Sequence, residues 1–345
     1  MRLLVVTQKV DKNDENLGFF HRWLEEFAKF TDGVRVIALQ EGVHSLPKNV
    51  SVFTFGKRNS RIAKLWKFWE LFSYHYARTD AVFFHMIPEY VMAAAPFLVS
   101  LKKPSGLWYV HKSVTPTLRW AERMVDWIFT ASELSFRLPS LRVLYTGHAI
   151  DTGTFRPIPN SQFPVSSSGI RLLILGRISP VKDIETAIRA CEVLKNTWQR
   201  AWTLSIVGGP LMPRDNDYLE SLKKMVKEKQ LEHYVSFHGS IPYNEVPSAY
   251  LDHDIFISMS TTGSMDKSVL EAMSSGLTII TANEAFKSLL PETYFLETRS
   301  PEFLAEHIKI LADEPRPNLT LRRLVEEKHG LENTIQKIIN AYTKF

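Results

Sequence analysis

The sequence predicts an α/β protein built from two doubly wound domains, each a parallel sheet with helices on both faces. Two observations support this class. Short and almost entirely apolar runs, typical of strands buried on both faces, alternate with stretches of helical periodicity. The alternation stops at the Pro- and Ser-rich stretch PIPNSQFPVSSSG (157–169) and then begins again, which indicates a linker between two domains.

In the first half, apolar runs that are bounded by polar or turn-forming residues are expected to be strands. They are RLLVV (2–6), VRVIAL (34–39), AVFFHM (81–86), PSGLWYVH (104–111), DWIFTAS (126–132) and RVLYTG (142–147). The spacing of apolar residues predicts helices over 18–30 and about 60–77.

The second half repeats the same pattern. Its expected strands are IRLLILG (170–176), WTLSIVGG (202–209), VSFHG (235–239), IFISMS (255–260) and LTIIT (277–281). Its expected helices cover 183–196, 216–230, 244–251 and 267–275.

Composition sets the broad class. The 345 residues are 45% hydrophobic and 23% charged, which is ordinary for a globular protein large enough for two cores. The single cysteine, Cys191, excludes a disulfide framework and a cysteine-based metal site. The opening residues lack the apolar run of a signal peptide, and no apolar stretch reaches 18 residues. We therefore expect a cytoplasmic protein.

The charge is unevenly divided. Residues 1–165 hold 21 Lys and Arg against 14 Asp and Glu, whereas residues 166–345 hold 21 against 23. A basic first half is typical of proteins that meet an anionic partner, such as a phosphate, a membrane surface or a nucleic acid. A merely solvated surface is the alternative. No nucleic-acid-binding module is recognisable, so we expect no nucleic-acid partner.

The residues that follow the strands of the second half are candidates for a ligand site, because open parallel sheets bind ligands beyond the carboxyl ends of their strands. They are Gly176, Arg177 and Lys182, then Gly208 and Gly209, then His238 and Gly239, and finally the stretch 261–271. The helix expected from residue 267 would present free amides and a positive dipole end there. Amides with Arg and Lys favour a diphosphate.

Glu271 stands one turn into that helix, where its side chain can lean back toward the same site and accept hydrogen bonds from ribose hydroxyls. Two simpler interpretations remain open. Asp266 can be only the N-cap of the helix, and Lys267 with Glu271 can be only a surface ion pair four residues apart.

Several motifs resemble, in order and spacing, the nucleotide-sugar domain of family 4 glycosyltransferases of GT-B fold. They are LLILGRISPVKDIETAI, SIVGGP, VSFHGSIPYNEVPSAYLDHDIFISMS and DKSVLEAMSSGLTIIT in the second half, and WYVHKS, DWIFTAS and TGHAIDTGTFRP in the first. The resemblance is strong for 165–285 and weaker for 1–100. It implies two Rossmann-like domains facing across a cleft: an acceptor domain (1–160), a donor domain (161–325) and a C-terminal helix (326–345) that returns to the first domain.

The resemblance also implies roles for individual residues. Arg177 and Lys182 would grip the donor diphosphate, helped by Gly18 of the first domain and by the backbone at Ser268, Val269 and Leu270. Glu271 would bind the ribose. Gly208, Phe237, His238 and Gly239 would line the base, and His111 would reach the transferred sugar from the first domain as a catalytic residue.

One position departs from the family pattern. Family 4 enzymes usually carry a second glutamate eight residues before the ribose-binding one, and this chain has Gly263 there. The segment GSMDK resembles a variant subgroup in which Gly263 and Ser264 lie near the donor sugar and Asp266 or Lys267 acts on it.

The implied activity is transfer of a sugar, with retention of configuration, from a UDP- or GDP-sugar to a hydroxyl of a glycan or lipid-linked glycan. No cofactor or metal is expected, because no His, Cys or Asp cluster has ligand spacing. A non-catalytic nucleotide-sugar-binding or scaffold protein and a sugar-nucleotide 2-epimerase are the alternatives. A nicotinamide dehydrogenase is disfavoured, because neither opening strand leads into Gly-x-Gly-x-x-Gly.

The stretch KRNSRIAKLWKFWELFSYHYAR (57–78) is basic, aromatic and helical in spacing. Trp66, Phe68, Trp69 and Phe72 cover a face wide enough to pack on the sheet, and a core helix is the favoured interpretation. The alternative is peripheral contact with an anionic membrane at its inner face, which would present the first domain to a lipid-linked acceptor.

Overall fold

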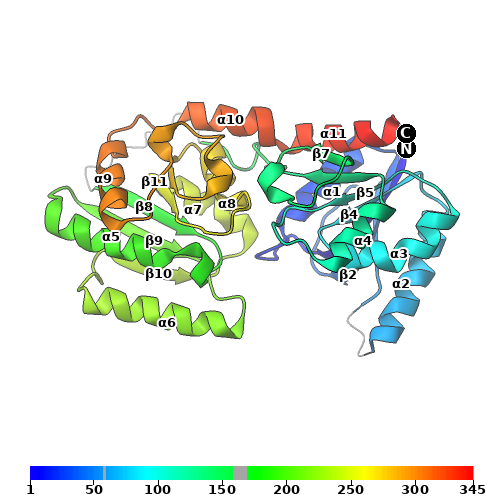
Figure 1. Cartoon of the computed structure of the whole chain (residues 1–345), viewed down its shortest axis with the longest axis horizontal. Coiled ribbons are helices and arrows are strands. Elements are labelled where there is room, and N and C mark those ends of the chain that lie inside the picture. Colours follow the sequence, from blue (N-terminus) through cyan, green and yellow to red (C-terminus); the bar gives the residue numbers. More distant parts are fainter. Residues whose placement is uncertain (57–59, 158–168, 345) are drawn as a thin grey trace. The chain divides into compact units, whose positions relative to one another are not determined.

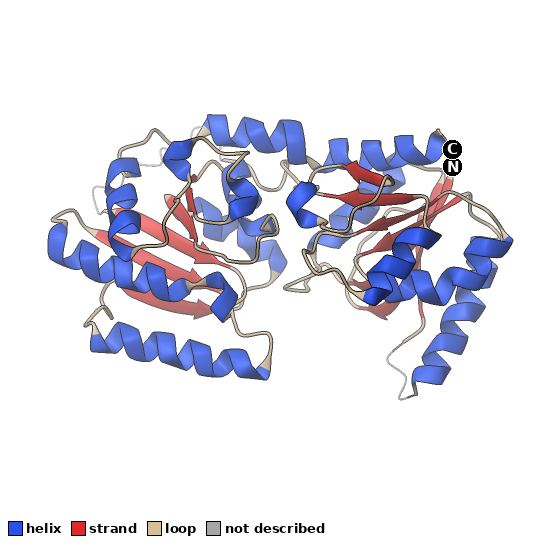
Figure 2. Ribbon diagram, in the orientation of Figure 1, coloured by secondary structure: helices blue, strands red, loops and turns tan. Residues whose placement is uncertain are grey.

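The computed structural model describes residues 1–56, 60–157 and 169–344, and it divides into two compact units. The first unit comprises Met1–Ala149 and Lys328–Phe345, and the second comprises Ile150–Glu327. Each unit contains one parallel sheet covered by helices, so the predicted class of two Rossmann-like α/β domains is confirmed (Figures 1 and 2). Most of the predicted linker, including the expected boundary at 160, lies outside the described residues.

The sheet of the first unit has seven parallel strands in the order β3-β2-β1-β4-β5-β6-β7. The strands are β1 (Arg2–Val10), β2 (Gly33–Glu41), β3 (Val50–Thr54), β4 (Ala81–His85), β5 (Ser105–Trp108), β6 (Trp127–Thr130) and β7 (Val143–Tyr145). In β1, Leu3 and Val5 face one core and Leu4 and Val6 face the other. Both faces of the sheet are therefore buried, which explains its nearly continuous apolar strands.

Helices of the first unit cover both faces. They are α1 (Phe19–Phe30), α2 (Arg61–Tyr76), α3 (Pro88–Ser100), α4 (Pro116–Met124) and α11 (Leu331–Thr343). Helices α1 and α11 pack on one face, and α2, α3 and α4 pack on the other. The last helix of the chain thus contributes to the first unit, where Ile335 and Ile338 are fully buried and Tyr342 donates a hydrogen bond to the Val82 carbonyl at 3.0 Å.

The sheet of the second unit has five parallel strands in the order β10-β9-β8-β11-β12. The strands are β8 (Ile170–Leu175), β9 (Trp202–Val207), β10 (Val235–Gly239), β11 (Ile255–Ser258) and β12 (Thr278–Thr281). Helices α5 (Ile184–Thr197), α6 (Pro213–Glu228) and α9 (Pro301–Leu311) cover one face. Helices α7 (Val246–Leu251), α8 (Lys267–Ser274) and α10 (Leu319–His329) cover the other.

The structure contains elements that the apolar pattern did not reveal. They are β3, α3, α4, α9 and α10. Strand β3 is a half-exposed edge strand, and α3 contains Pro96 and is apolar almost all round, so neither gives a clear period. No helix among the described residues is long and apolar enough to cross a lipid bilayer.

Helix α2 also corrects one expectation. Phe68 and Phe72 are buried on the sheet, and Trp69 is half-buried with its indole N–H donating to the Ala93 carbonyl at 2.7 Å. Trp66, however, is 65% exposed, so its assignment to the core-facing side is wrong. The first turns of α2 extend beyond the edge of the sheet core, which leaves an apolar surface near Trp66.

Glycines let the strand ends of the second unit approach one another. Gly208 follows β9 with φ +138°, and a Cβ there would collide with the carbonyl oxygen of Gly176 at the end of β8. Its amide donates to the Gly239 carbonyl at 2.8 Å, which ties β9 to β10. Both the conformation and the close contact require glycine at 208.

We predict that Gly208→Ala destabilises the second unit more than Gly176→Ala. Gly176 has a similar φ of +141° but open space where a Cβ would be, so the pair of variants separates steric collision from backbone strain. The collision should add about 1–3 kcal/mol to the loss of unfolding free energy. Equal losses for the two variants in urea denaturation would contradict this close packing.

Candidate functional site

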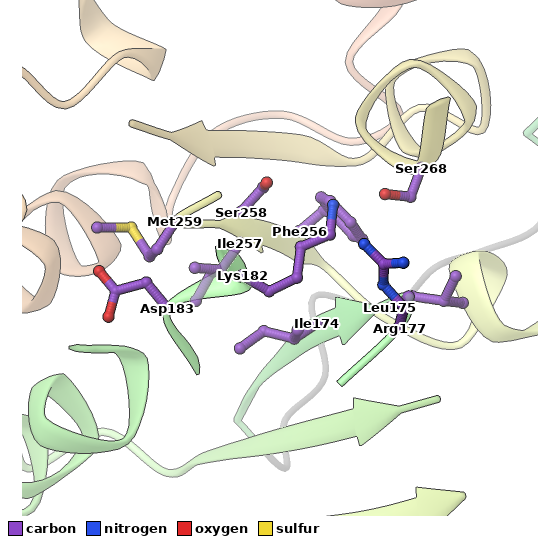
Figure 3. A pocket seen from close by; sticks show the side chains of 11 residues that line it. Ile174, Leu175, Arg177, Lys182, Asp183, Phe256, Ile257, Ser258, Met259 and Ser268 are labelled. Atoms are coloured by element: carbon purple, nitrogen blue, oxygen red, sulfur yellow. The ribbon is translucent and has the colours of Figure 1, made fainter. Parts of the chain in front are cut away.

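The parallel strands of the second unit end at one edge of the sheet, where a hollow of about 350 Å³ opens. This is the edge at which open α/β sheets bind ligands. Its polar lining comes from the turn after β8, from the end of β11 and from the start of α8, and consists of Arg177, Lys182, Asp183, Ser258 and Ser268. Figure 3 shows the side chains of Arg177 and Lys182 directed into the middle of this hollow.

Arg177 is the exposed cation of the hollow. It follows Gly176 directly, so the end of β8 determines where its side chain begins. Throughout the described parts of the chain, no group forms a hydrogen bond or ion pair with its guanidinium. The arginine is therefore positioned to bind an anion bidentately.

Lys182 enters the same hollow from a short 3-10 turn, Pro180–Lys182. Its ammonium donates a hydrogen bond to Oδ1 of Asp266 at 2.8 Å, and both side chains are largely buried. Lys182, which was predicted to bind a diphosphate, is thus already paired with a carboxylate. An incoming anion would share or replace that partner.

Asp266 occupies the N-cap position of α8 but does not cap the helix with its side chain. Its Oδ1 accepts from Lys182, and its Oδ2 accepts from the Asn283 amide at 3.2 Å. The interpretation of Asp266 as a simple capping residue is therefore wrong. Because α8 lacks a side-chain cap, its positive end is available to an anion beside Ser268.

The backbone of the first turn of α8 limits which amides can contribute. The Val269 amide donates to the Asp266 carbonyl at 3.2 Å, and the side chains of Val269 and Leu270 are fully buried in the core. The Val269 amide is therefore engaged within the helix, contrary to the expectation that it faces a ligand. Ser268 is the residue of this turn that lines the hollow.

Glu271 is buried with only 4% of its surface exposed, and its carboxylate is held by three donors of the chain. Oε1 accepts from the Lys267 ammonium at 2.6 Å and from the Tyr243 hydroxyl at 2.9 Å. Oε2 accepts from the Tyr250 hydroxyl at 3.2 Å. The Lys267 ammonium also donates to the Tyr243 hydroxyl at 2.8 Å, so lysine, tyrosine and glutamate form a closed triangle.

Burial shapes the protonation of this cluster. It lowers the pKa of Lys267, while the neighbouring Glu271 carboxylate acts in the opposite direction. Burial also raises the pKa of Tyr243 and Tyr250 well above the ordinary value, and the negative charge of Glu271 reinforces the rise. Both tyrosines are therefore neutral hydroxyl donors to an ionised carboxylate.

Three of the four residues expected to line the base lie on β10, and the fourth, Gly208, follows the neighbouring strand β9. Phe237 is half-buried against the core, whereas His238 and Gly239 are exposed. His238 contacts the Ser236 hydroxyl through Nε2 at 2.9 Å. Gly239 ends the strand with φ +71°, and its carbonyl accepts the hydrogen bond from the Gly208 amide.

The loop between β11 and α8 contains the two residues assigned to the donor sugar. Gly263 is buried with φ +63°, and the Ser264 carbonyl accepts from the Asn283 amide at 2.8 Å. Asn283, which follows β12, thus holds both this loop and Asp266.

Three residues of the site escaped the sequence analysis: Tyr243, Tyr250 and Asn283. A signal existed for each. The tyrosines are seven residues apart, one just before α7 and one within it, and a spacing of seven places residues on one face of a helix. Asn283 follows a strand end, where site residues were sought in the other strands but not in this one.

His111 and Gly18 belong to the first unit. His111 follows β5, is exposed, and accepts a hydrogen bond at Nδ1 from the Ser113 amide at 3.1 Å. Gly18 is buried at the N-cap position of α1. Their roles toward a donor bound in the second unit stay predictions.

The described residues hold no group of three or more His, Cys, Asp or Glu side chains arranged to bind a metal ion. The cations of the hollow are side chains: Arg177 and Lys182.

The second half of the chain is similar in sequence to a known protein family. Residues 161–328 match the family model described as "Glycosyl transferases group 1". A GDP-mannose-dependent alpha-(1-6)-phosphatidylinositol monomannoside mannosyltransferase of Mycobacterium tuberculosis is 26% identical over 157 residues, which cover 42% of this chain and 39% of that protein. Mannosylfructose-phosphate synthase of Agrobacterium fabrum is 30% identical over 136 residues, which cover 35% and 30%. The chain thus matches less than half the length of these relatives.

Solved structures share the fold over the whole chain. The Anabaena protein HepE, crystallised with UDP, superposes with a TM-score of 0.77 at 17% identity and full coverage of both chains. Sucrose-phosphate synthase of Thermosynechococcus elongatus gives 0.76 at 14% identity, covering 100% of this chain and 99% of that one. At such low identity these similarities establish the fold alone. The family match falls on the unit that carries the hollow, so the sequence similarity to group 1 glycosyltransferases lies in the same part of the chain as the site.

Proposed function

We propose that this protein transfers a sugar from a nucleotide-diphosphate sugar to a hydroxyl acceptor, with retention of configuration. The observation that carries the proposal is the convergence of Arg177, Lys182 and the uncapped start of α8 on one hollow, with the Glu271 carboxylate one turn further along. Cations and a helix end suit a diphosphate, and a carboxylate suits the ribose diol.

In the proposed reaction the bond between the anomeric carbon and the diphosphate oxygen breaks, and the acceptor oxygen bonds to that carbon on the same face. The acceptor proton passes to the departing diphosphate. Arg177 and Lys182 stabilise the charge that develops on the leaving group, which is the main catalytic contribution and requires no metal ion. His111, Asp266 and Lys267 are assigned to the reacting sugar, with Gly263 and Ser264 beside it.

The names of the relatives suggest which donor to test first. One relative is described as GDP-mannose-dependent and another as mannosylfructose-phosphate synthase. We therefore place GDP-mannose first among the UDP- and GDP-sugars. A glycan or lipid-linked glycan is the proposed acceptor, and a cytoplasmic location at the membrane fits such an acceptor.

A panel of UDP-, GDP- and ADP-sugars, followed by nucleotide release with and without acceptors, tests the activity. Nucleotide binding without turnover on any donor would favour a non-catalytic binding or scaffold protein. Conversion of the sugar nucleotide to its epimer without transfer would favour the 2-epimerase.

Arg177→Ala is predicted to weaken binding of the cognate nucleoside diphosphate by about 1.5–3 kcal/mol, the range for a hydrogen bond to a charged group. Arg189→Ala is the matched control, because Arg189 is an exposed arginine of α5 that pairs with Glu185 away from the hollow. Calorimetric titration should show a change for Arg177 alone. Identical affinities in wild type and both variants would refute the assignment of the diphosphate site.

His111→Ala is predicted to reduce the transfer rate by about 10²-fold, the scale of one electrostatic contact in a catalytic site. Its affinity for the free diphosphate should stay unchanged, because that ligand has no sugar for the imidazole to reach. The check is the initial rate with the best donor beside the diphosphate dissociation constant. A wild-type rate would remove His111 from the mechanism.

We further propose that the first unit contacts an anionic membrane through the start of α2. Ile62 is 70% exposed, and it shares an outward stripe with Leu65 and Trp66. Arg61 and Lys64 lie on the same turns. An exposed apolar stripe bordered by cations suits the interface of an anionic bilayer, where the apolar side chains enter and the cations meet headgroups.

The double variant Ile62→Ser/Trp66→Ser is predicted to lose most binding to phosphatidylcholine vesicles that contain about one third phosphatidylglycerol. Phe303→Ser/Ile310→Ser removes equally exposed apolar side chains from α9 and should leave binding unchanged. Vesicle flotation at low and high salt provides the measurement. Equal binding by both double variants, or a change in oligomeric state in the first, would overturn the membrane assignment.

A further inference from the structure

Lys267 occupies the position on Glu271 that a bound ribose would need. Each carboxylate oxygen has two lone pairs, and both lone pairs of Oε1 are taken by the Lys267 ammonium and the Tyr243 hydroxyl. Oε2 accepts one hydrogen bond, from Tyr250, and has room for one more. A vicinal diol that binds across both oxygens therefore needs one present donor of Oε1 to leave.

The two tyrosines are not suited to leave. The Tyr250 ring is fully buried and packs on Phe155 and Phe256 at centroid distances of 5.8 and 5.9 Å. The Tyr243 ring packs on Phe155 at 5.9 Å. Moving the Tyr250 hydroxyl would require a ring of the close-packed core to move, and such rings have little freedom to do so. The Tyr243 ring is half-buried, and moving its hydroxyl would break its packing on Phe155.

Lys267 is suited to leave. It is the first residue of α8, its side chain is 19% exposed, and its flexible four-carbon stem lets the ammonium move without any backbone change. Burial lowers the pKa of its ammonium, and the Glu271 carboxylate acts in the opposite direction. The ammonium therefore needs an anionic partner wherever it moves.

A diphosphate in the hollow would supply that partner. Ser268, the next residue of α8, lines the hollow together with Arg177 and Lys182. Lys182 is already held by Asp266, so a bound diphosphate would have few uncompensated cations around it. Lys267 directly precedes Ser268 at the start of α8, so its side chain begins next to the hollow, and its ammonium reaches Glu271.

Building on the proposed function, we propose that Lys267 is an exchangeable counter-ion of the donor site. It pairs with Glu271 when the site is empty and with the donor diphosphate when a nucleotide sugar is bound. The ribose hydroxyls can then donate hydrogen bonds to Glu271, because the Lys267 ammonium has moved to the diphosphate. A nucleoside, which has no phosphate to receive Lys267, must compete with it and binds weakly, so the exchange makes the site selective for diphosphates.

The test compares a nucleoside with its diphosphate on wild type and Lys267→Met, using the base that binds best. Loss of the ammonium should strengthen nucleoside binding about threefold and weaken diphosphate binding about tenfold, so that the ratio of the two dissociation constants falls at least tenfold. Lys267→Arg, which retains the charge, should keep most of that ratio. Lys224→Met removes the lysine of an exposed pair with Glu228 and should change neither affinity.

An unchanged ratio of the two dissociation constants in Lys267→Met would overturn the exchange. A loss of both affinities by the same factor is one such result, and it is expected if the lysine only holds Glu271 in place. If Lys267→Met does not fold, as judged by its thermal midpoint, Lys267→Gln keeps a neutral hydrogen-bond donor and gives the same comparison. Absence of diphosphate binding in wild type would instead refute the proposed function itself.

Discussion

The burial of one carboxylate, that of Glu271, organises the ligand edge of the second unit. An ionised carboxylate is stable in a core only if hydrogen-bond donors replace its water. Those donors come from three places in the chain: Lys267 at the start of α8, Tyr243 just before α7, and Tyr250 within α7. Phe155 packs on both tyrosine rings. The hydrogen bonds to Glu271 thus fix α7 and α8 relative to each other. They also fix Lys267, the residue before Ser268, which lines the hollow.

Ion pairs within the chain explain how buried lysines at the site are stabilised. Lys182 is paired with Asp266 and Lys267 with Glu271, so neither buried ammonium lacks a counter-charge. A lone buried ammonium would be costly, whereas a paired one is tolerated. In the proposed exchange, an anion that enters the hollow would replace the carboxylate partners of these lysines, and the exposed Arg177 would bind it without giving up a partner of its own.

Much of the fold was predictable because buried parallel strands leave a clear apolar signature. The strands around β1 and β8 are apolar on both faces, and α5 repeats apolar residues at Ile184, Ala187, Ile188 and Cys191. The sequence did not reveal β3 or α3, since an exposed edge strand and an all-apolar helix with an internal proline lack that contrast. Trp66 was misassigned because periodicity specifies a face of α2 but not where the sheet beneath it ends.

The site was predictable to the level of the strand ends, and no further. Parallel topology alone directs attention to Arg177, Lys182 and the start of α8. The partners of those residues come from tertiary packing: Asp266 is 84 residues from Lys182, and Tyr243 is 28 from Glu271. The sequence therefore left two interpretations of Lys267 and Glu271, an ion pair within the helix or a ligand site. In the proposed exchange they are successive states of the same atoms, because the ammonium that pairs with Glu271 covers an oxygen that a bound ribose would require.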